Sequence, residues 1–184
     1  MQELTQHGMA RLQQNLIDVI KEAQAKVGYR KEAIRLYYPL RTINHFFDGS
    51  YTPEQMEEML GGLENDTKEA LGGVTVTRKD ERFCFAIPEE GVTQVHEQMG
   101  PNEFIQKLVD LIRTPDCTIE QVRDLFFATS PEVHFEEIPD NEEFEYLIYF
   151  EDASIDPYYY CFNKEFGMLS YHRFLPEDYA DVMR

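Results

Sequence analysis

The sequence predicts an α+β fold: a helical N-terminal part packed on a mostly antiparallel sheet, with about six helices and five to six strands. In the first quarter of the chain, apolar residues recur at helical spacing. Near residue 74 the period changes to two, as it does in strands. The last third contains four strand-like runs joined by short links, which favour an antiparallel meander.

Residues 3–27 show the pattern of one amphipathic helix, and Gly28 stands where a C-terminal cap belongs. Residues 30–48 are expected to form a second helical region, which Pro39 interrupts because proline lacks an amide donor. The segment Thr52–Gln55 is a capping box with proline at the first helical position, so it predicts another helix start.

The later elements follow from the same signals. A polar turn over residues 78–81 separates two alternating runs, and a second capping box begins at Thr118. The expected parts of one domain over residues 1–184 are a helical region 1–72, a hairpin 74–87, helices within 90–128 and an antiparallel meander 133–174.

The net charge of −18 is unevenly distributed along the chain. It is +2 over residues 1–50, −8 over 51–123, −11 over 124–163 and −1 over 164–184. The most acidic part is rich in Phe and Tyr, so we expect a folded sheet with a negative face. A phosphate footprint needs clustered Lys and Arg, so nucleic acids and anionic membranes are excluded as partners. The remaining partners are another protein or a second copy of the chain.

The three cysteines, Cys84, Cys117 and Cys161, contain no CxxC spacing. The start of the chain lacks the apolar segment of a signal peptide, and no apolar run reaches the length of about 18 residues that a membrane span needs. These features predict a cytoplasmic protein with free, mostly buried thiols.

Acidic residues offer a candidate cation site. Glu136, Asp152 and Asp156 could bring oxygen ligands together on the sheet. However, the EF-hand pattern fails, because Pro157 stands at the sixth loop position and Asn163 at the twelfth. A solvated face that limits aggregation is the favoured interpretation, and no metal or cofactor is expected.

Candidate catalytic groups are few. His134 and His172 lie on predicted strands of one sheet, where together with Glu136 they could form a metal or acid–base site. Cys117 directly precedes the capped helix at Thr118, a position that can activate a thiol, although Asp116 opposes this. Surface histidines and buried cysteines are the favoured interpretation.

Two further patterns concern binding. Residues 104–127 have the outline of a helix–turn–helix followed by strands, as in a winged helix, but the second helix lacks the positive charge for DNA. Residues 26–41 carry five bases and one acid among tyrosines, which could bind phosphate or meet the acidic sheet. No Gly-rich phosphate loop is present.

Two segments resemble a known family. Residues 28–47, GYRKEAIRLYYPLRTINHFF, and residues 163–179, NKEFGMLSYHRFLPEDY, are similar to an uncharacterised family of glutamate-rich proteins from anaerobic Gram-positive bacteria, a domain of unknown function. The resemblance implies a bacterial, cytosolic, single-domain protein and assigns no catalytic residue.

The sequence thus favours a non-enzymatic interaction module, with self-association through the basic N-terminal and acidic sheet surfaces as one form. The alternative is a small-ligand or metal-binding protein or enzyme with a cleft near His134, His172 and Glu136. A third hypothesis is a winged-helix-like module without DNA-binding charge.

Overall fold

The computed structural model describes residues 2–183, with side chains from residue 5 onward, and confirms the α+β class. The chain divides into two compact units, residues 1–102 and residues 103–184. The described strands pair only in antiparallel fashion. Within residues 2–183, no helix has both the length and the apolar character to cross a membrane. The expectation of one domain over 1–184 stays a prediction.

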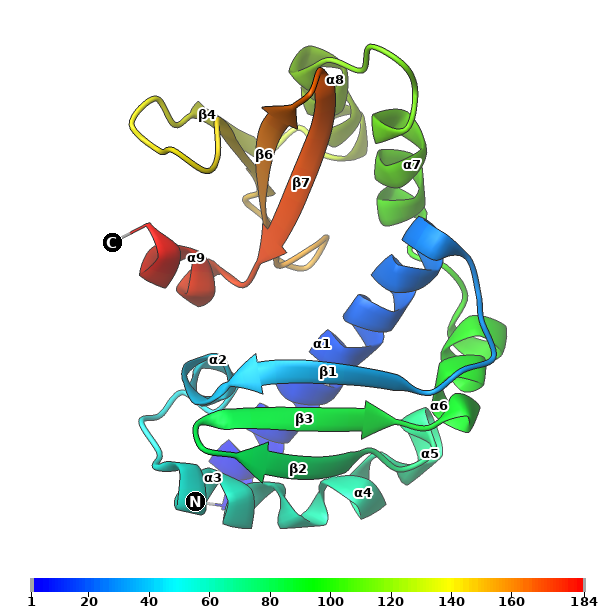
Figure 1. The fold of residues 1–184 in the computed structure, drawn as a ribbon, viewed down its shortest axis with the longest axis vertical. Coiled ribbons are helices and arrows are strands. Elements are labelled where there is room, and N and C mark those ends of the chain that lie inside the picture. The colour runs from blue at the N-terminus through cyan, green and yellow to red at the C-terminus, as the bar shows by residue number, and fades with distance from the viewer. Residues whose placement is uncertain (1, 184) are drawn as a thin grey trace. The chain divides into compact units, whose positions relative to one another are not determined.

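The first unit begins with the long helix α1 (Gln2–Val27), as the periodicity predicts (Figure 1). Leu12, Leu16 and Ile20 have no exposed surface, so one side of the helix is core. The helix ends at Gly28, whose φ of 79° is a conformation that suits glycine.

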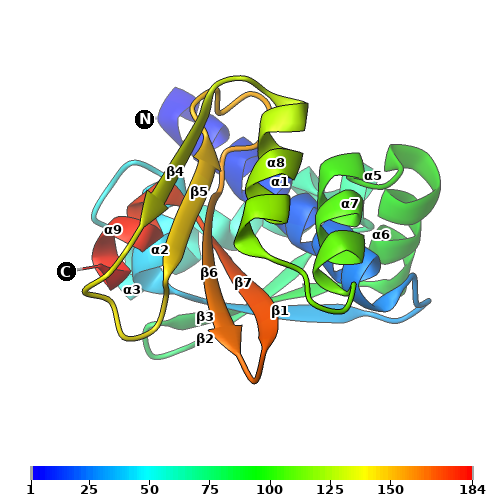
Figure 2. The ribbon, with the colours of Figure 1, turned by 90° about the horizontal axis from the view of Figure 1, so that it is seen from above.

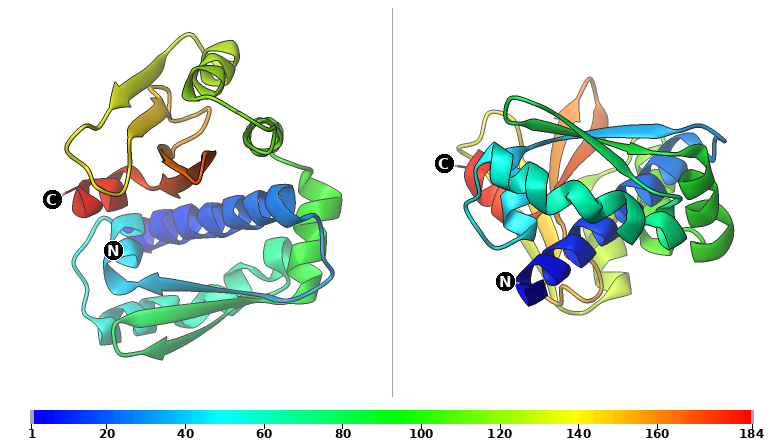
Figure 3. Two further views of the ribbon diagram at one scale, coloured as in Figure 1. Left: turned by 45° about the horizontal axis from the view of Figure 1, so that its top comes forward. Right: turned by 90° about the horizontal axis from the view of Figure 1, so that it is seen from below.

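A three-stranded sheet follows, built from β1 (Ile34–Pro39), β2 (Thr75–Lys79) and β3 (Arg82–Ile87) in the order β1-β3-β2. The predicted hairpin is therefore confirmed as β2 and β3. Helices α1, α3 (Pro53–Met59), α4 (Leu63–Asp66) and α5 (Lys68–Leu71) lie on one side of this sheet (Figure 3). No helix within residues 2–102 lies on the opposite side.

The predicted second helical region, and with it the all-helical stretch 1–72, is wrong at residues 34–39, which form β1. Leu36 and Tyr38 face the helices while Arg35 and Tyr37 face outward, so the segment alternates with a period of two. Pro39 also disfavours helix in the residue before it. The helix begins only after the proline, as α2 (Leu40–Phe46).

Short helices connect the strands. The capping box at Thr52 is confirmed, with the Gln55 amide donating to the Thr52 hydroxyl at 3.3 Å and the Thr52 amide donating to Gln55 Oε1 at 2.9 Å. The helices outnumber the predicted six because residues 53–71 form several separate turns. These helices are α3 (Pro53–Met59), the 3-10 helix η1 (Leu60–Gly62), α4 (Leu63–Asp66) and α5 (Lys68–Leu71), with α6 (Glu89–Gln94) and the π-helix η2 (Val95–Met99) after the sheet.

The described part of the second unit contains two helices, then a four-stranded meander and a final helix (Figure 2). The meander and the capping box at Thr118 are both confirmed. The prediction of one sheet with five to six strands is wrong: the described strands number seven in two sheets, because β3 pairs with β1 and leaves the hairpin outside the meander. The elements are α7 (Glu103–Ile112), α8 (Ile119–Thr129), β4 (Val133–Glu137), β5 (Tyr146–Phe150), β6 (Tyr159–Glu165), β7 (Met168–Phe174) and α9 (Pro176–Val182).

Aromatic rings join α7 and α8 to one face of the meander. The Phe126 ring lies 4.8 Å from Phe104, 5.0 Å from Phe150 and 5.3 Å from Tyr160, measured between centroids. On the other face, a smaller cluster of Phe144, Leu147 and Cys161 packs with Tyr179 of α9. Both faces of the central strands are therefore used for packing.

The β6–β7 turn contains an unusual residue. Glu165 pairs with Met168, so Phe166 and Gly167 form a two-residue loop, and their φ angles of 51° and 81° are those of a type I′ turn. Bulky residues rarely adopt positive φ. The Phe166 side chain is fully exposed. No packing in the described residues therefore offsets the strain of this backbone.

We expect Phe166→Asn to raise the free energy of unfolding by about 1 kcal/mol, because asparagine tolerates the left-handed region better than bulky residues such as phenylalanine. Urea unfolding followed by circular dichroism measures the change. The matched control is Phe166→Ala, which removes the same ring but keeps the backbone strain and should leave stability nearly unchanged. Equal stability of the two variants would contradict the strain argument.

Candidate functional site

The outer face of the three-stranded sheet forms an open hollow of about 1220 Å³, here called the trough. Its side chains come from the outward positions of all three strands. They are Arg35 and Tyr37 from β1, Cys84, Ala86 and Arg82 from β3, and Thr75, Thr77 and Lys79 from β2. The turn residues Asp80 and Glu81 also line it.

The strand register explains why this face is hollow. In one row, Ala86 of the central strand lies between Arg35 and Thr75, and in the next, Cys84 lies between Tyr37 and Thr77. The central strand therefore provides a low floor of small side chains, while the edge strands carry longer ones. A width of two strand spacings, about 10 Å, suits a single chain segment.

The buried face of the same sheet fixes which residues line the trough. Phe83, Phe85 and Ile87 have no exposed surface. The Tyr38 hydroxyl donates to Asn15 Oδ1 of α1 at 2.6 Å, which adds a polar anchor to the packed side. A register slip of one residue would expose this apolar set, so the outward residues are strongly specified.

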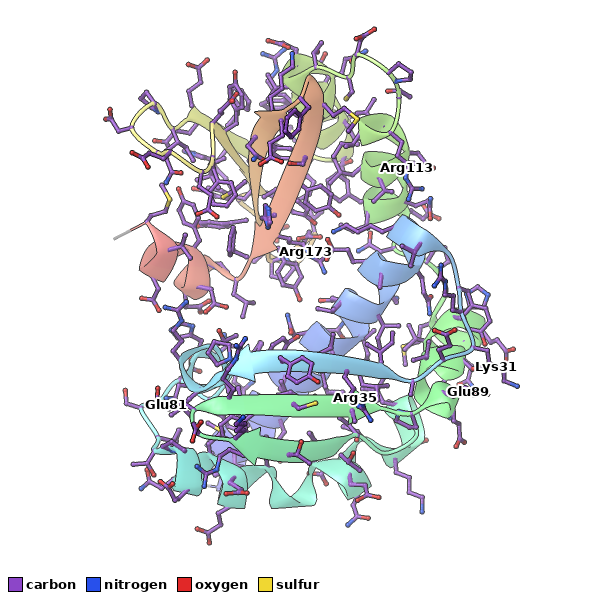
Figure 4. All side chains as sticks on the ribbon, viewed as in Figure 1. Lys31, Arg35, Glu81, Glu89, Arg113 and Arg173 are labelled. Carbon is purple, nitrogen blue, oxygen red and sulfur yellow. The ribbon has the colours of Figure 1, made fainter. Side chains whose placement is uncertain are left out.

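Three of the four bases that line the trough have no acidic partner within the described part of the unit. Among residues 5–102, whose side chains the structure describes, none forms an ion pair with Arg35, Lys79 or Arg82. The fourth base that lines the trough, Arg78, is held by Glu54 at 3.2 Å and Glu57 at 2.9 Å. Figure 4 shows Arg35 on the side of the sheet that faces the viewer, while α1 passes behind.

The predicted basic cluster of residues 26–41 does not act as one surface. Lys26 pairs with Glu22 at 2.9 Å, and Lys31 pairs with Glu89 at 3.4 Å (Figure 4). Arg35 alone among these bases lines the trough.

The predicted histidine pair does not converge. His134 lies on β4 and His172 on β7, the opposite edge strands of the meander. Three strand spacings separate them, or about 14 Å. His134 does meet Glu136, with Nε2 and Oε2 3.1 Å apart, and its ring stacks on Tyr149 at 4.7 Å. The pair of histidines thus does not share a site.

The Cys117 thiol is not activated. It is buried, and burial raises the pKa of the Cys117 thiol above its usual value. Its Sγ lies 3.7 Å from the Thr118 carbonyl oxygen, which accepts its weak hydrogen bond. The confirmed capping box therefore does not lower the pKa of this cysteine. All three cysteines are free, as predicted.

Two of the predicted cation ligands, Asp152 and Asp156, accept hydrogen bonds from donors of the protein itself. Asp156 is buried, and its oxygens accept from the Tyr158 amide at 3.0 Å and from the Tyr160 hydroxyl at 2.8 Å. Asp152 accepts from the Ser154 amide at 2.9 Å. Among the side chains of residues 5–183, Glu136, Asp152 and Asp156 belong to no group of three possible ligands within 4.8 Å of one another.

Arg123, on the second helix of the predicted helix–turn–helix, also has partners within the protein. Its Nη2 lies 3.1 Å from Asp124 Oδ1, and its guanidinium lies over the Phe135 ring at 5.9 Å. The helix–turn–helix outline itself is present as α7 and α8.

A family model described as "Domain of unknown function, E. rectale Gene description (DUF3877)" matches residues 9–183. The chain belongs to this family. The DUF3877 match confirms the resemblance to an uncharacterised family named for an anaerobic Gram-positive bacterium. Neither the curated proteins nor the solved structures gave a match.

Sequence reasoning missed the trough of this DUF3877 chain, although part of its signal is visible. Thr75 and Thr77 alternate with apolar residues, and so do Cys84 and Ala86. The contribution of the third strand, Arg35 and Tyr37, was missed because the sequence pattern favours a helix for their segment. A strand interpretation before Pro39 would have put these two side chains on the open face.

Proposed function

We propose that this protein is a non-enzymatic interaction module that binds an acidic protein segment in the trough. One observation carries the proposal: a sheet face that no described helix of its own unit covers, with three bases that lack acidic partners within the unit, in a chain of net charge −18. Charge complementarity of this kind sets partner choice more than affinity.

The spacing of the bases favours a chain segment over a small anion. Arg35 lies opposite Ala86, which is four residues from Arg82 on the central strand. Those four residues span about 13 Å. A single phosphate cannot reach both ends of this distance, whereas carboxylates four residues apart on an extended chain can. Tyr37 and Thr77 lie in the row between the two arginines, and Thr75 lies in the row of Arg35. All three line the trough, where they can contact backbone and side chains of the segment.

Two observations favour binding over catalysis at the predicted catalytic residues. The Cys117 thiol is buried, and His134 and His172 lie on opposite edge strands. We also place the protein in the cytoplasm, because its three cysteines are free and a reducing compartment keeps them so.

The test is binding of a fluorescein-labelled peptide with glutamates four residues apart, measured by fluorescence anisotropy at an ionic strength of about 0.1 M, where long-range repulsion by the acidic chain is screened. Arg35→Glu plus Arg82→Glu should weaken binding by about tenfold to a hundredfold, because two contacts of about 0.5 kcal/mol each become repulsive. The control is Arg30→Glu plus Lys68→Glu, the same charge change at exposed bases outside the trough. An equal loss of peptide affinity in both variants would indicate a general effect of net charge and contradict the proposal.

A further inference from the structure

We infer that the acidic segment bound by the trough is the β4–β5 loop of a second copy of this chain. This inference rests on the proposed function, since it names the partner of the same face. The loop spans residues 138–145 and is here called the acidic loop. Its acids are Asp140, Glu142, Glu143 and Glu145, all exposed.

The structure concentrates negative charge at this loop. The predicted negative sheet face is wrong in detail, because both faces of β5 take part in packing, with Ile148 buried on one and Leu147 on the other. The acids lie instead at strand ends and in turns. Glu136 and Glu137 end β4 directly before the loop, and no base occurs between Arg123 and Lys164. The loop is therefore a concentrated acidic surface.

The acidic loop is also already ordered. The Asn141 Oδ1 accepts the backbone amides of Glu143 at 2.8 Å and Phe144 at 2.7 Å. The Ile138 amide donates to the Glu145 carbonyl at 2.8 Å, which closes the base of the loop. Phe144 is buried and anchors it. Binding would therefore cost little additional ordering entropy.

The two surfaces complement each other and occur on every copy. The trough has three bases without acidic partners in its unit, and the loop has four exposed acids with no base nearby in sequence. Because each chain carries one trough and one loop, two copies can exchange loops and make the contact twice. Two equal contacts in a closed pair strengthen one another.

The net charge of the chain determines the salt concentration at which two copies should associate. Two chains of −18 repel each other, and at low salt this long-range term opposes association. At an ionic strength of about 0.1 M the repulsion is screened beyond roughly 10 Å, while contact pairs persist. Association should therefore be strongest at intermediate salt and weaken again near 1 M, where the screening length is about 3 Å.

Sedimentation equilibrium of the full chain tests the inference. Wild type should rise above the monomer mass of 21.7 kDa with increasing concentration. The trough variant, Arg35→Glu plus Arg82→Glu, and the loop variant, Glu142→Lys plus Glu143→Lys, should each stay monomeric. Their mixture should associate, because the reversed trough then faces a reversed loop and the two unchanged surfaces still match. The control Glu58→Lys plus Glu97→Lys should associate as wild type does.

Three results would overturn the inference: a wild type that stays monomeric at every concentration and salt, a loop variant that associates as wild type does, or a mixture that stays monomeric. If the peptide still requires the trough bases in that case, the trough takes an acidic segment of a different protein and only the partner is wrong. If the trough variant binds the peptide as wild type does, the proposed function fails as well.

Discussion

Asp156→Ala is expected to lower the free energy of unfolding by about 3 kcal/mol, the cost of removing a buried charged acceptor from its donors. The Tyr158 amide and the Tyr160 hydroxyl both donate to this carboxylate, at 3.0 and 2.8 Å. Neither donor is free to reach water, because Tyr160 has no exposed surface and Tyr158 is buried. Thermal and urea unfolding by circular dichroism measure the loss.

The matched control is Asp152→Ala. Asp152 is exposed, and its carboxylate accepts a local hydrogen bond from the Ser154 amide. Its removal should cost about 0.5 kcal/mol, the lower end for such a bond. Equal melting of the two variants would contradict a structural role for Asp156.

The same pair of variants separates a structural carboxylate from a metal ligand. If Asp156 bound a cation, Ca²⁺, Mg²⁺ or Zn²⁺ would raise the melting temperature of the wild type but not of Asp156→Ala. With both oxygens accepting from protein donors, we expect no cation-dependent difference between the two proteins.

The sequence predicted the elements whose signals are local. Helix α1 with its Gly28 cap, both capping boxes, the hairpin and the meander depend on neighbouring residues, and all are confirmed. The β1 strand is different, because it pairs with β3, some fifty residues later in the chain. A six-residue strand between two helices gives little local signal, and its partner supplies the stability.

The same reason limits prediction of the sites. Strand order decides whether His134 and His172 meet, and strand order is a long-range property that a single sequence does not reveal. The distance between them follows at once from the order β4-β5-β6-β7. Asp156 illustrates the converse case. The acidic residues near it in sequence suggested an exposed set of cation ligands. Instead, the Tyr158 amide and the Tyr160 hydroxyl donate hydrogen bonds to its carboxylate, which is buried.

The second large effect is alkaline destabilisation of the second unit. Burial raises the pKa of Cys161 from 9.0 to about 12. Burial, and then the charge of Asp156, raise the pKa of Tyr160 well above its usual value, although Arg173 opposes this. Burial is also the main cause of the raised pKa values of Tyr146, Tyr149 and Tyr179.

A raised pKa means that the folded state keeps a proton that the unfolded state releases. Stability from such a group is complete below the unfolded pKa and is lost as the pH rises towards the folded pKa. For Cys161 the window runs from pH 9.0 to about 12. Within it, each pH unit should lower the free energy of unfolding by about 1.4 kcal/mol.

Cys161→Ala removes the ionisable group and should flatten the fall in stability between pH 9 and 11 by about that slope. Urea unfolding at several pH values, in a reducing agent that keeps the thiols reduced, measures it. Val122→Ala is the control, because it removes buried volume from the same unit without a titrating group and should shift stability equally at every pH. If Cys161→Ala kept the wild-type slope, ionisation of Cys161 would not drive alkaline unfolding, and the buried tyrosines would have to account for it.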